Sequence, residues 1–551
     1  MQRLVDDAGF AGGEDARIAA TRASWREDAA VGTVLALILI VPLFMIRIPF
    51  LVDYPNHLAR MHILATGADT PGLRHIFRVA WAFIPNMSMD LIVPALAQVM
   101  PLDVAGRVFI AFAIVLPPVG VIALHRAWFG TRAWWPWVAV LTSAGAFLVF
   151  GFMNYLSGLG LALIAAAWHA RIGTRPRPRD IAVAMIWGIV CLLAHLFAFG
   201  LLLLLMVSNE IGRRRRDHLV RRALPILAAA VVPIALYLAF GPRKSYATGG
   251  SLEGALHDTL RWGLFGEPMK RLEWLPAPFT GQGVLLGLIA AALVVLPLLW
   301  AAWRGRLRVS AMMPFAFACL LAAYLLLPEQ VLDTAMIFQR LSVPLALVGI
   351  AGVWPDLPRR AGQALALATV ALITLRSATM AALWHQQARL LAQVEHVIAD
   401  IPPGSSVVAV RDGTHIYTVE PDEPADHRIL RHTQAYMHVP ALVTLERDSF
   451  YPLIYSTPTK YPIALLPKYE KQTQDAGYLP LTDQLGPAAA IPPANRRCGV
   501  LPGQIPCALW SWPQRYDYVL RLNAHDTPPP DAGHLKEVAR DGWAVLYRVV
   551  R

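Results

Sequence analysis

The sequence AVGTVLALILIVPLFMIRIPF, residues 30–50, is followed directly by LVDYPNHLAR, residues 51–60. The first stretch is apolar and long enough to cross a bilayer as one helix, which takes about 20 residues. Residues 1–28 before it are polar, so we expect a cytoplasmic N-terminal tail and no cleavable signal peptide. The polar segment that begins at Asp53 is then expected at the outer face of the membrane.

The composition of the whole chain is typical of a membrane protein. Of its 551 residues, 56% are hydrophobic and only 16% are charged, whereas soluble domains have about 25% charged residues. The net charge of +12 comes largely from arginines in short clusters between apolar runs, as the positive-inside rule expects of cytoplasmic loops. We therefore expect no nucleic-acid partner. The clusters are Arg175–Arg179, Arg213–Arg222, Arg304–Arg308 and Arg359–Arg360.

Repeated apolar runs predict a mainly α protein, a polytopic transmembrane helix bundle of about 11 spans. Two runs, Trp135–Trp168 and Ile181–Ser208, are expected to be hairpins, and the first should turn near Asn154. Arginines flank the second hairpin on both sides, so His195 at its middle should lie at the outer end. The single spans are expected at 30–50, 90–123, 223–240, 281–303, 311–327, 341–354 and 362–383.

The polar C-terminal region predicts a separate α/β domain. Strand-like strings occur at Ser406–Val410, Tyr516–Leu520 and Trp543–Tyr547, and His534–Arg540 has a helical pattern. An odd number of crossings places this region outside the cytoplasm. The expected organisation is a cytoplasmic tail (1–28), a transmembrane domain (29–390) with an amphipathic first outer loop (51–89), and an extracytoplasmic α/β domain (391–551).

The cysteines agree with that placement. Cys498 and Cys507 bracket a loop rich in glycine and proline in the C-terminal region, while the other two cysteines lie inside apolar runs. A nearby pair outside the membrane indicates a disulfide and an oxidising compartment. We therefore expect a multi-pass inner membrane protein whose C-terminal domain is extracytoplasmic or periplasmic.

Asp53 is the strongest candidate for a catalytic residue. An aspartate at the outer boundary can meet water, a lipid headgroup and a soluble acceptor, and at a normal pKa it is ionised at neutral pH and can act as a base. Asn56, His57 and Arg60 follow at spacings of three, four and seven, so they should share one helix face with it and bind substrate. The structural alternative is that Asp53 only caps a helix.

Further candidates for substrate binding lie at other outer span ends. Arg340 begins a late span and could hold a lipid phosphate, and Arg243 and Lys244 are placed in the same way. His195 at the hairpin tip is the fourth. Snorkelling to the interface is the structural alternative for the cations, and a plain structural polar group is the alternative for His195.

Nucleotide and metal motifs are missing from the sequence. It has no Walker A loop, no GxGxxG unit between strand and helix, no HExxH and no zinc-type Cys/His spacing. ATP hydrolysis as a driving force is unsupported, and no metal ligands are predicted. A divalent metal, Mg or Mn, bound through Asp53 with another acid stays an open alternative.

These features together resemble the GT-C superfamily of polytopic glycosyltransferases, which use polyprenyl-phosphate-linked sugars. The resemblance rests on the acid in Asp-Tyr-Pro-Asn-His-Leu-Ala-Arg (53–60), the amphipathic first outer loop, the paired short spans, the late outer loop ending in Gln339-Arg340 and the C-terminal outer domain. It implies that Asp53 acts as base or orients the acceptor and that Arg340 holds the donor phosphate. Tyr54 stands where some members have a second acid, which leaves metal dependence and subfamily open.

The function expected from this resemblance is a membrane glycosyltransferase, transferring a hexosyl or pentosyl group. Its partners would be a lipid-linked donor on polyprenyl phosphate and an extracytoplasmic acceptor, which is a cell-envelope glycan, a lipid or a protein. Two alternatives remain at this stage. A transporter or a lipid or glycan flippase would also need a polytopic bundle, and a non-catalytic envelope assembly protein would use the outer domain to bind a partner.

Overall fold

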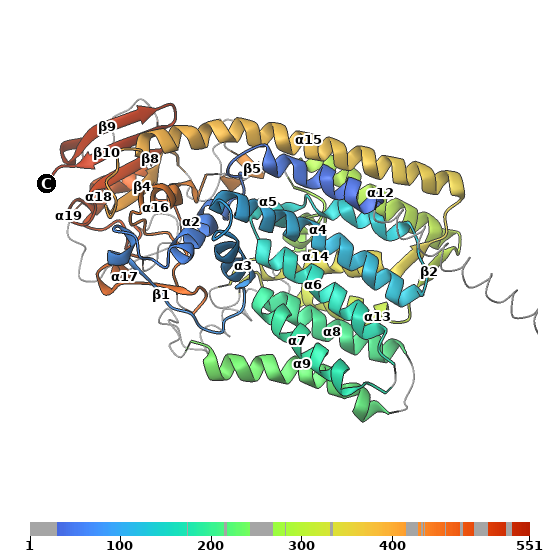
Figure 1. The fold of residues 1–551 in the computed structure, drawn as a ribbon. Coiled ribbons are helices and arrows are strands. Elements are labelled where there is room, and N and C mark those ends of the chain that lie inside the picture. The colour runs from blue at the N-terminus through green and yellow to red at the C-terminus, as the bar shows by residue number, and fades with distance from the viewer. Residues whose placement is uncertain are drawn as a thin grey trace, which may run out of the picture.

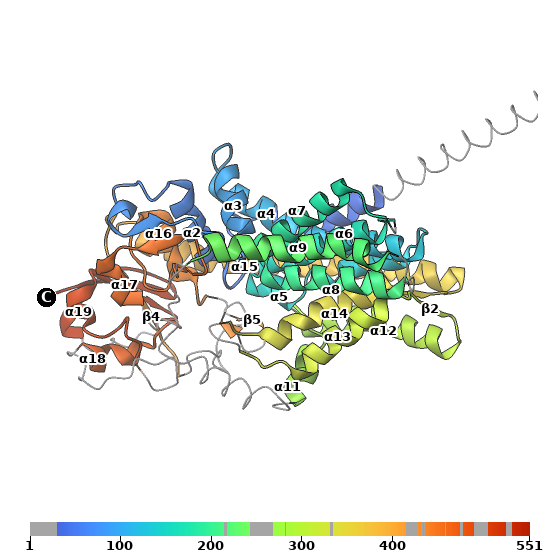
Figure 2. The same ribbon diagram turned by 90° about the horizontal axis from the view of Figure 1, so that it is seen from below.

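The computed structural model describes residues 30–551 except 174, 214–217, 243–267, 282, 331–333, 415–427, 431–432, 435, 458, 474–477, 490–504 and 525–531. The molecule is elongated, with a bundle of helices at one end and the strands of the C-terminal region at the other (Figures 1 and 2). The helix α15, Arg359–Ile398, runs along the whole bundle and reaches the sheet.

The bundle is built from helices that match most of the expected spans. Four described helices are long and apolar enough to cross a membrane: α4 (Leu102–Phe129), α9 (Leu219–Phe240), α12 (Val284–Trp303) and α15. This makes the chain an integral membrane protein. The shorter helices around them are Ala30–Phe44, α5 (Ala146–Phe150), α6 (Met153–Ala170), α7 (Pro178–Ala194), α8 (Leu196–Gly212), α13 (Met313–Leu326) and α14 (Ile337–Gly352).

Three helix boundaries differ from the predicted ones. The span expected at 90–123 is two helices, α3 (Ser88–Leu96) and α4, because Pro101 stands at the N-cap of α4 and ends the preceding turn. The first hairpin turns at Gly151, with φ +91°, and Asn154 lies inside α6. The last span continues to Ile398, because its C-terminal half packs on the sheet.

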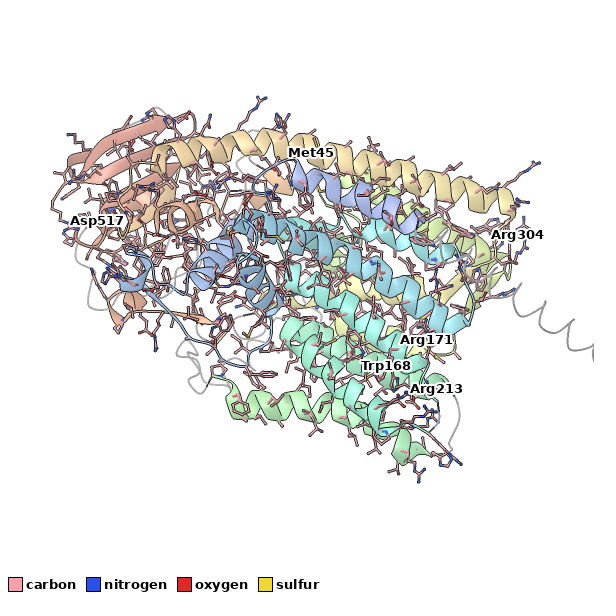
Figure 3. The ribbon with its side chains drawn as sticks, viewed as in Figure 1. Met45, Trp168, Arg171, Arg213, Arg304 and Asp517 are labelled. Carbon is pink, nitrogen blue, oxygen red and sulfur yellow. The ribbon has the colours of Figure 1, made fainter. Side chains whose placement is uncertain are left out.

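Arginine gathers at the end of the bundle away from the sheet. Figure 3 places Arg171, Arg213 and Arg304 at that end and Asp517 at the opposite one. Arg213 donates to the carbonyls of His169, Ala170 and Ile172 and so ties the end of α8 to the end of α6. Arg213 and Arg304, from two of the clusters that the sequence places in cytoplasmic loops, therefore lie at the bundle end away from the sheet.

The C-terminal region contains a mixed four-stranded sheet in the order β4-β8-β10-β9. β4 (Val407–Arg411) runs parallel to β8 (Tyr518–Leu522), and β10 (Ala544–Val549) is antiparallel to both β8 and β9 (Leu535–Asp541). The prediction of a helix over His534–Arg540 was wrong. This segment is the edge strand β9, because a tight turn at Gly542, with φ +51°, folds it back onto β10.

The first outer loop packs into the C-terminal region. Its segment Phe77–Val79 forms β1, which pairs antiparallel with β7 (Ile463–Leu465). The helix α2 (Tyr54–Ala65) contacts α16 (Leu442–Arg447). The remaining short elements are α11 (Pro268–Trp274), α17 (Pro467–Thr473), α18 (Leu485–Ala488), α19 (Trp512–Arg515), β2 (Leu307–Val309), β3 (Val353–Pro355), β5 (Arg428–Leu430) and β6 (Thr433–Gln434).

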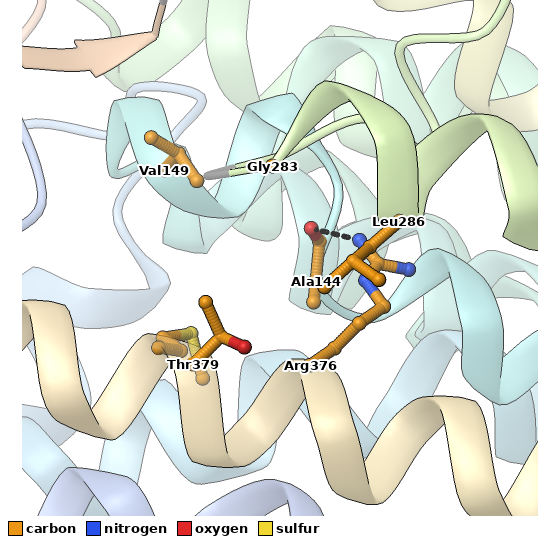
Figure 4. Close-up of a pocket in the computed structure, with 7 residues that line it drawn as sticks. Ala144, Val149, Gly283, Leu286, Arg376 and Thr379 are labelled. Carbon is orange, nitrogen blue, oxygen red and sulfur yellow. Dashed lines mark hydrogen bonds between the residues drawn. The ribbon is translucent and has the colours of Figure 1, made fainter.

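Arg376 on α15 holds the bundle together near a small pocket (Figure 4). Its guanidinium donates to the carbonyl oxygens of Leu141 at 2.7 Å and of Ala144 and Phe279 at 2.6 Å each. The pocket beside it measures about 20 Å³, which is room for about one water molecule. Arg376 is therefore a structural residue that satisfies carbonyls where helical segments end.

Candidate functional site

A larger cavity lies where the helix bundle meets the C-terminal region. Its volume is about 340 Å³, and its wall comes from α2, the start of α3, α6, α14, the turn between α7 and α8, and residues 455, 457, 460 and 461. Four of the side chains singled out in the sequence line it together, although they come from three separate parts of the chain. They are Asp53, His57, His195 and Arg340.

Asp53 occupies the N-cap position of α2 but does not use its side chain as a cap. Pro55 lies in the first turn, yet the carboxylate of Asp53 makes no capping hydrogen bond. It accepts instead from the hydroxyl of Tyr455, at 3.0 Å. Gly151, with φ +91°, allows the turn before α6 to approach closely, because a Cβ there would lie 3.1 Å from the Cβ of Asp53. The carboxylate is thus free to take part in chemistry in the cavity.

The protonation of Asp53 differs from the sequence expectation. Burial raises the pKa of Asp53 to about 7, although the Tyr455 hydrogen bond and the positive charges of Arg340 and Arg60 act in the opposite direction. A carboxyl group with a pKa near neutrality is a stronger base, once ionised, than an exposed one. Perturbed groups of this kind in a cavity are typical of functional sites.

Arg340 supplies a positive charge to the same cavity. It lies in the first turn of α14, and its guanidinium carbon is 4.5 Å from the ring centre of Phe152 and 5.8 Å from that of Phe197. Within the described part of the chain, the guanidinium has no hydrogen bond and no ion pair, and its Nε is buried without a partner. A buried cation held only by aromatic rings favours an anionic ligand.

The two histidines on the cavity wall differ in their surroundings. His195 accepts a hydrogen bond at Nδ1 from the backbone N–H of Phe197, at 3.1 Å, and so caps α8. Its ring also packs edge-on against Tyr155. His57 has no partner for its buried Nδ1 among the described residues, and burial lowers its pKa well below the usual value. Both imidazoles can therefore meet a ligand through a ring nitrogen.

Asn56 and Arg60 lie behind the cavity wall. The amide of Asn56 bonds the carbonyl oxygen of Leu453 at 2.7 Å and the backbone N–H of Tyr455 at 2.9 Å. The guanidinium of Arg60 is fully buried and forms two hydrogen bonds with Asp90, at 2.6 and 3.2 Å. Both side chains thus support the wall. Arg243 and Lys244, the other two predicted substrate-binding residues, lie outside the described residues.

Replacing Asp90 with asparagine tests the structural role of Arg60. We expect it to lower the free energy of unfolding by about 3–5 kcal/mol, because it leaves a buried guanidinium without its counter-charge. Thermal and denaturant unfolding in detergent would measure this. Asp356→Asn is the matched control, since it breaks an exposed pair with Arg306 and should cost less than about 1 kcal/mol. Equal losses in the two variants would contradict the assignment.

No sequence pattern singled out the cavity residues that come from the C-terminal region. Tyr455 bonds Asp53, and Tyr461 stacks on Tyr455 with ring centres 5.4 Å apart and an interplanar angle of 12°. His438 lies behind them and reaches Asp53 at 3.5 Å. Aromatic residues in a polar region without periodicity are indistinguishable from ordinary core residues, so only the tertiary contact reveals them.

The described cavity wall fits an anion better than a divalent cation. In the part of the chain that the structure describes, no group of three or more His, Cys, Asp or Glu side chains is arranged to hold a metal ion. Asp53 is the carboxylate on this wall, and Arg340 and Lys460 add positive charge to it. Hard cations such as Mg²⁺ need several oxygen ligands, and nearby arginine opposes their binding.

Cys191 and Cys319, the two cysteines inside apolar runs, are free thiols. Cys507 takes part in a disulfide, while Cys498, its predicted partner, lies outside the described residues.

Comparison with solved structures identifies the fold. ArnT from Cupriavidus metallidurans bound to undecaprenyl phosphate superposes with a TM-score of 0.52 and 14% sequence identity, over 95% of this chain and 98% of that one. The same ArnT in the apo state gives a TM-score of 0.51 and 13% identity, over 96% and 98% of the two chains. No protein-family model and no curated protein sequence matches the chain.

Proposed function

On the premise that this chain has the fold of ArnT, a GT-C glycosyltransferase, we propose that it is a membrane glycosyltransferase. It moves a sugar from a polyprenyl-phosphate-linked donor to an extracytoplasmic acceptor, which is a cell-envelope glycan, a lipid or a protein. One observation supports this proposal beyond the fold: the buried carboxylate of Asp53 faces one cavity with the guanidinium of Arg340, which has no hydrogen bond or ion pair among the described residues.

The two groups match the charges that appear in such a transfer. Arg340 binds the phosphate of the donor and stabilises the negative charge that grows on it as the bond between the sugar carbon and the phosphate oxygen breaks. Asp53 takes the proton of the acceptor hydroxyl as its oxygen bonds to the sugar carbon. The polyprenyl phosphate leaves with the bonding electrons, and Asp53 afterwards releases the proton to water.

The placement of the cavity supports a reaction at the outer membrane face. It lies at the junction with the C-terminal region, whereas Arg171, Arg213 and Arg304 lie at the far end of the bundle (Figure 3). Under the positive-inside rule that far end is cytoplasmic. The cavity and the C-terminal domain are then extracytoplasmic, which is the side where a finished lipid-linked sugar and an envelope acceptor would meet.

A transfer assay with the purified protein tests the proposal. Proteoliposomes would contain the protein and a labelled sugar carried on undecaprenyl phosphate, and membrane or envelope extract would supply the acceptor. Labelled product together with free undecaprenyl phosphate is the expected result. Movement of the labelled lipid across the bilayer in liposomes that lack acceptor, with no transfer in its presence, would favour a flippase. Neither transfer nor movement would favour an assembly protein.

The pH dependence of the reaction should report the carboxyl group of Asp53. Because burial raises the pKa of Asp53 to about 7, the basic form is lost as the pH falls through that value. We expect kcat/KM to decline about tenfold per pH unit below about pH 7, measured with the same donor across the acid range. An acid limb near pH 4, the ordinary range of an exposed carboxyl, would contradict Asp53 as the base.

A further inference from the structure

We propose that Tyr455 and His438 are positioning residues, which hold one carboxylate oxygen of Asp53 through a directed chain of hydrogen bonds so that its other oxygen meets the acceptor. This inference rests on the proposed function, because it assigns the supporting partners of the proposed base. Both residues come from the C-terminal region and lie far from Asp53 in sequence. The chain of bonds begins at Asn56 and ends at Asp53.

The backbone fixes the orientation of the Asn56 amide. The Oδ1 of Asn56 accepts from the N–H of Tyr455 at 2.9 Å, and its Nδ2 donates to the carbonyl oxygen of Leu453 at 2.7 Å. A backbone N–H can only donate and a carbonyl can only accept, so the two ends of the amide are distinguishable. The nitrogen of Asn56 therefore also faces Nδ1 of His438, at 3.2 Å.

The orientation of Asn56 sets the tautomer of His438. Burial lowers the pKa of His438 to about 4, so its imidazole is neutral at neutral pH. Nδ1 accepts from Asn56, which leaves the proton on Nε2. That Nε2 lies 3.0 Å from the hydroxyl oxygen of Tyr455 and donates to it. The hydroxyl of Tyr455 then has its own proton available for Oδ1 of Asp53, also at 3.0 Å.

Every bond in this chain donates toward Asp53. Successive hydrogen bonds in one direction polarise each other, so Tyr455 is a better donor than an isolated tyrosine. The chain engages Oδ1 of Asp53, while Oδ2 has no hydrogen-bond partner in the described part of the chain. Oδ2 is therefore the oxygen left to accept the proton of an acceptor hydroxyl.

The ring of Tyr455 is held on more than one side. It stacks on Tyr461, and the guanidinium carbon of Arg60, on α2, lies 4.3 Å from the ring centre of Tyr461. The ring of His438 packs against Tyr455 with centres 5.1 Å apart. A donor fixed by packing in this way keeps its hydrogen bond as Asp53 gains and loses a proton, which is what a positioning residue must do.

Several charged or titratable groups face Asp53 besides this chain. Burial raises the pKa of Tyr455 well above its usual value and that of Tyr461 to about 12, so both hydroxyls stay protonated at neutral pH. The remaining groups around Asp53 are His57 and Arg60 on α2, Arg340 on α14, His195 between α7 and α8, Tyr155 on α6, and Lys460.

The alternative is that Tyr455 and His438 only fasten the C-terminal region to α2. Removing the Tyr455 hydroxyl would then lower stability equally at every pH. As a positioning residue Tyr455 favours the ionised form of Asp53, so Tyr455→Phe should raise the pKa of Asp53 by about one unit. A positioning role for Tyr455 and a role in attachment alone therefore predict different changes in the pH dependence of stability.

The first test is unfolding of the full-length protein in detergent across a range of pH, without any substrate. The difference in midpoint temperature between the wild type and Asp53→Asn isolates the titration of Asp53 and should level off near pH 7. When the same difference is measured in the Tyr455→Phe background, the pH at which it levels off should rise by about one unit. Tyr451→Phe is the matched control, since its hydroxyl is buried without a partner among the described residues and should not move the point.

Two substitutions of His438 extend the test and cover a failure of Tyr455→Phe to fold. His438→Leu removes the donor to Tyr455, and the pH at which the stability difference levels off should rise by a smaller amount. His438→Gln keeps an amide donor and should restore part of the wild-type profile. No shift in any of these variants, or an equal shift in Tyr451→Phe, would overturn the inference.

The transfer assay supplies a second readout. Tyr455→Phe should lower kcat/KM at neutral pH by several-fold, about tenfold for a shift of one unit, and regain most of it at alkaline pH. A loss that is equal at all pH values would overturn the inference while leaving the proposed function intact. A shifted unfolding profile in a protein that transfers no sugar would instead overturn the proposed function and support the positioning of Asp53.

Discussion

Replacing Asp53 with asparagine should reduce sugar transfer by about 10²–10⁴-fold, the usual contribution of a general base. The amide has nearly the same shape, and its oxygen can still accept from Tyr455, which donates to Oδ1 at 3.0 Å in the wild type. The loss should therefore fall on kcat, with little change in the affinity for undecaprenyl phosphate. Single-turnover transfer at saturating donor, with lipid binding measured in parallel, would separate the two.

The same substitution should make the protein more stable. The pKa of Asp53 is raised by burial to about 7, so between the ordinary carboxyl pKa of about 4 and that value the folded state keeps a proton that the unfolded state has lost. Folding is weakened as the pH rises through this window and stays weakened above it. Asp53→Asn lacks this titration, and we expect it to unfold at a higher temperature above about pH 7 and at nearly the same temperature near pH 4.

Asp541→Asn is the control for both measurements. Asp541 ends the edge strand β9, is partly exposed and pairs with His396, away from the cavity. This variant should keep full transfer activity and show no comparable gain in stability. Full activity in Asp53→Asn would end the assignment of Asp53 as base. Loss of activity together with loss of stability at all pH values would instead indicate a structural role.

Replacing Arg340 with alanine should lower kcat/KM for transfer by about 10²–10³-fold, the range found when a single group that stabilises developing negative charge is removed. The guanidinium of Arg340 packs on the rings of Phe152 and Phe197 and has no hydrogen bond or ion pair in the described structure, so a donor phosphate can bind to it. Binding of undecaprenyl phosphate, measured by native mass spectrometry or a lipid competition assay, should weaken in the same variant.

Arg340→Lys sharpens the test. A lysine keeps the charge but loses the planar pair of donors that matches a phosphate, so partial activity is expected. Arg304→Ala is the control for charge alone, because Arg304 lies at the opposite end of the bundle (Figure 3). Unchanged lipid binding and unchanged transfer in Arg340→Ala would exclude Arg340 as the phosphate ligand.

Arg340 also influences Asp53. Its positive charge lowers the pKa of Asp53, so the alanine variant should shift the acid limb of kcat/KM to higher pH. Substitution of Arg340 thus changes both donor affinity and the protonation of Asp53. A double-mutant cycle with Asp53→Asn would measure this coupling, which is expected for two groups that act in one cavity.

The amino-acid sequence by itself determined the fold class and the position of the site along the chain. Apolar runs of membrane length, arginine clusters between them and the acid after the first run predicted a polytopic bundle, and the chain shares its fold with ArnT. The sequence also singled out Asp53 and Arg340, which the structure brings to one cavity. These signals are local, because hydropathy and charge are read from neighbouring residues.

Only the tertiary structure decided what surrounds those residues. The bond from Tyr455 to Asp53 joins positions 402 residues apart, and the strand β1 of the first outer loop finds its partner β7 in the C-terminal region. Burial set the pKa of Asp53 away from the value that the sequence suggested, and pairing turned the helical pattern of 534–540 into a strand. Desolvation and long-range hydrogen bonds depend on which segments pack together, and a local sequence pattern does not specify that packing.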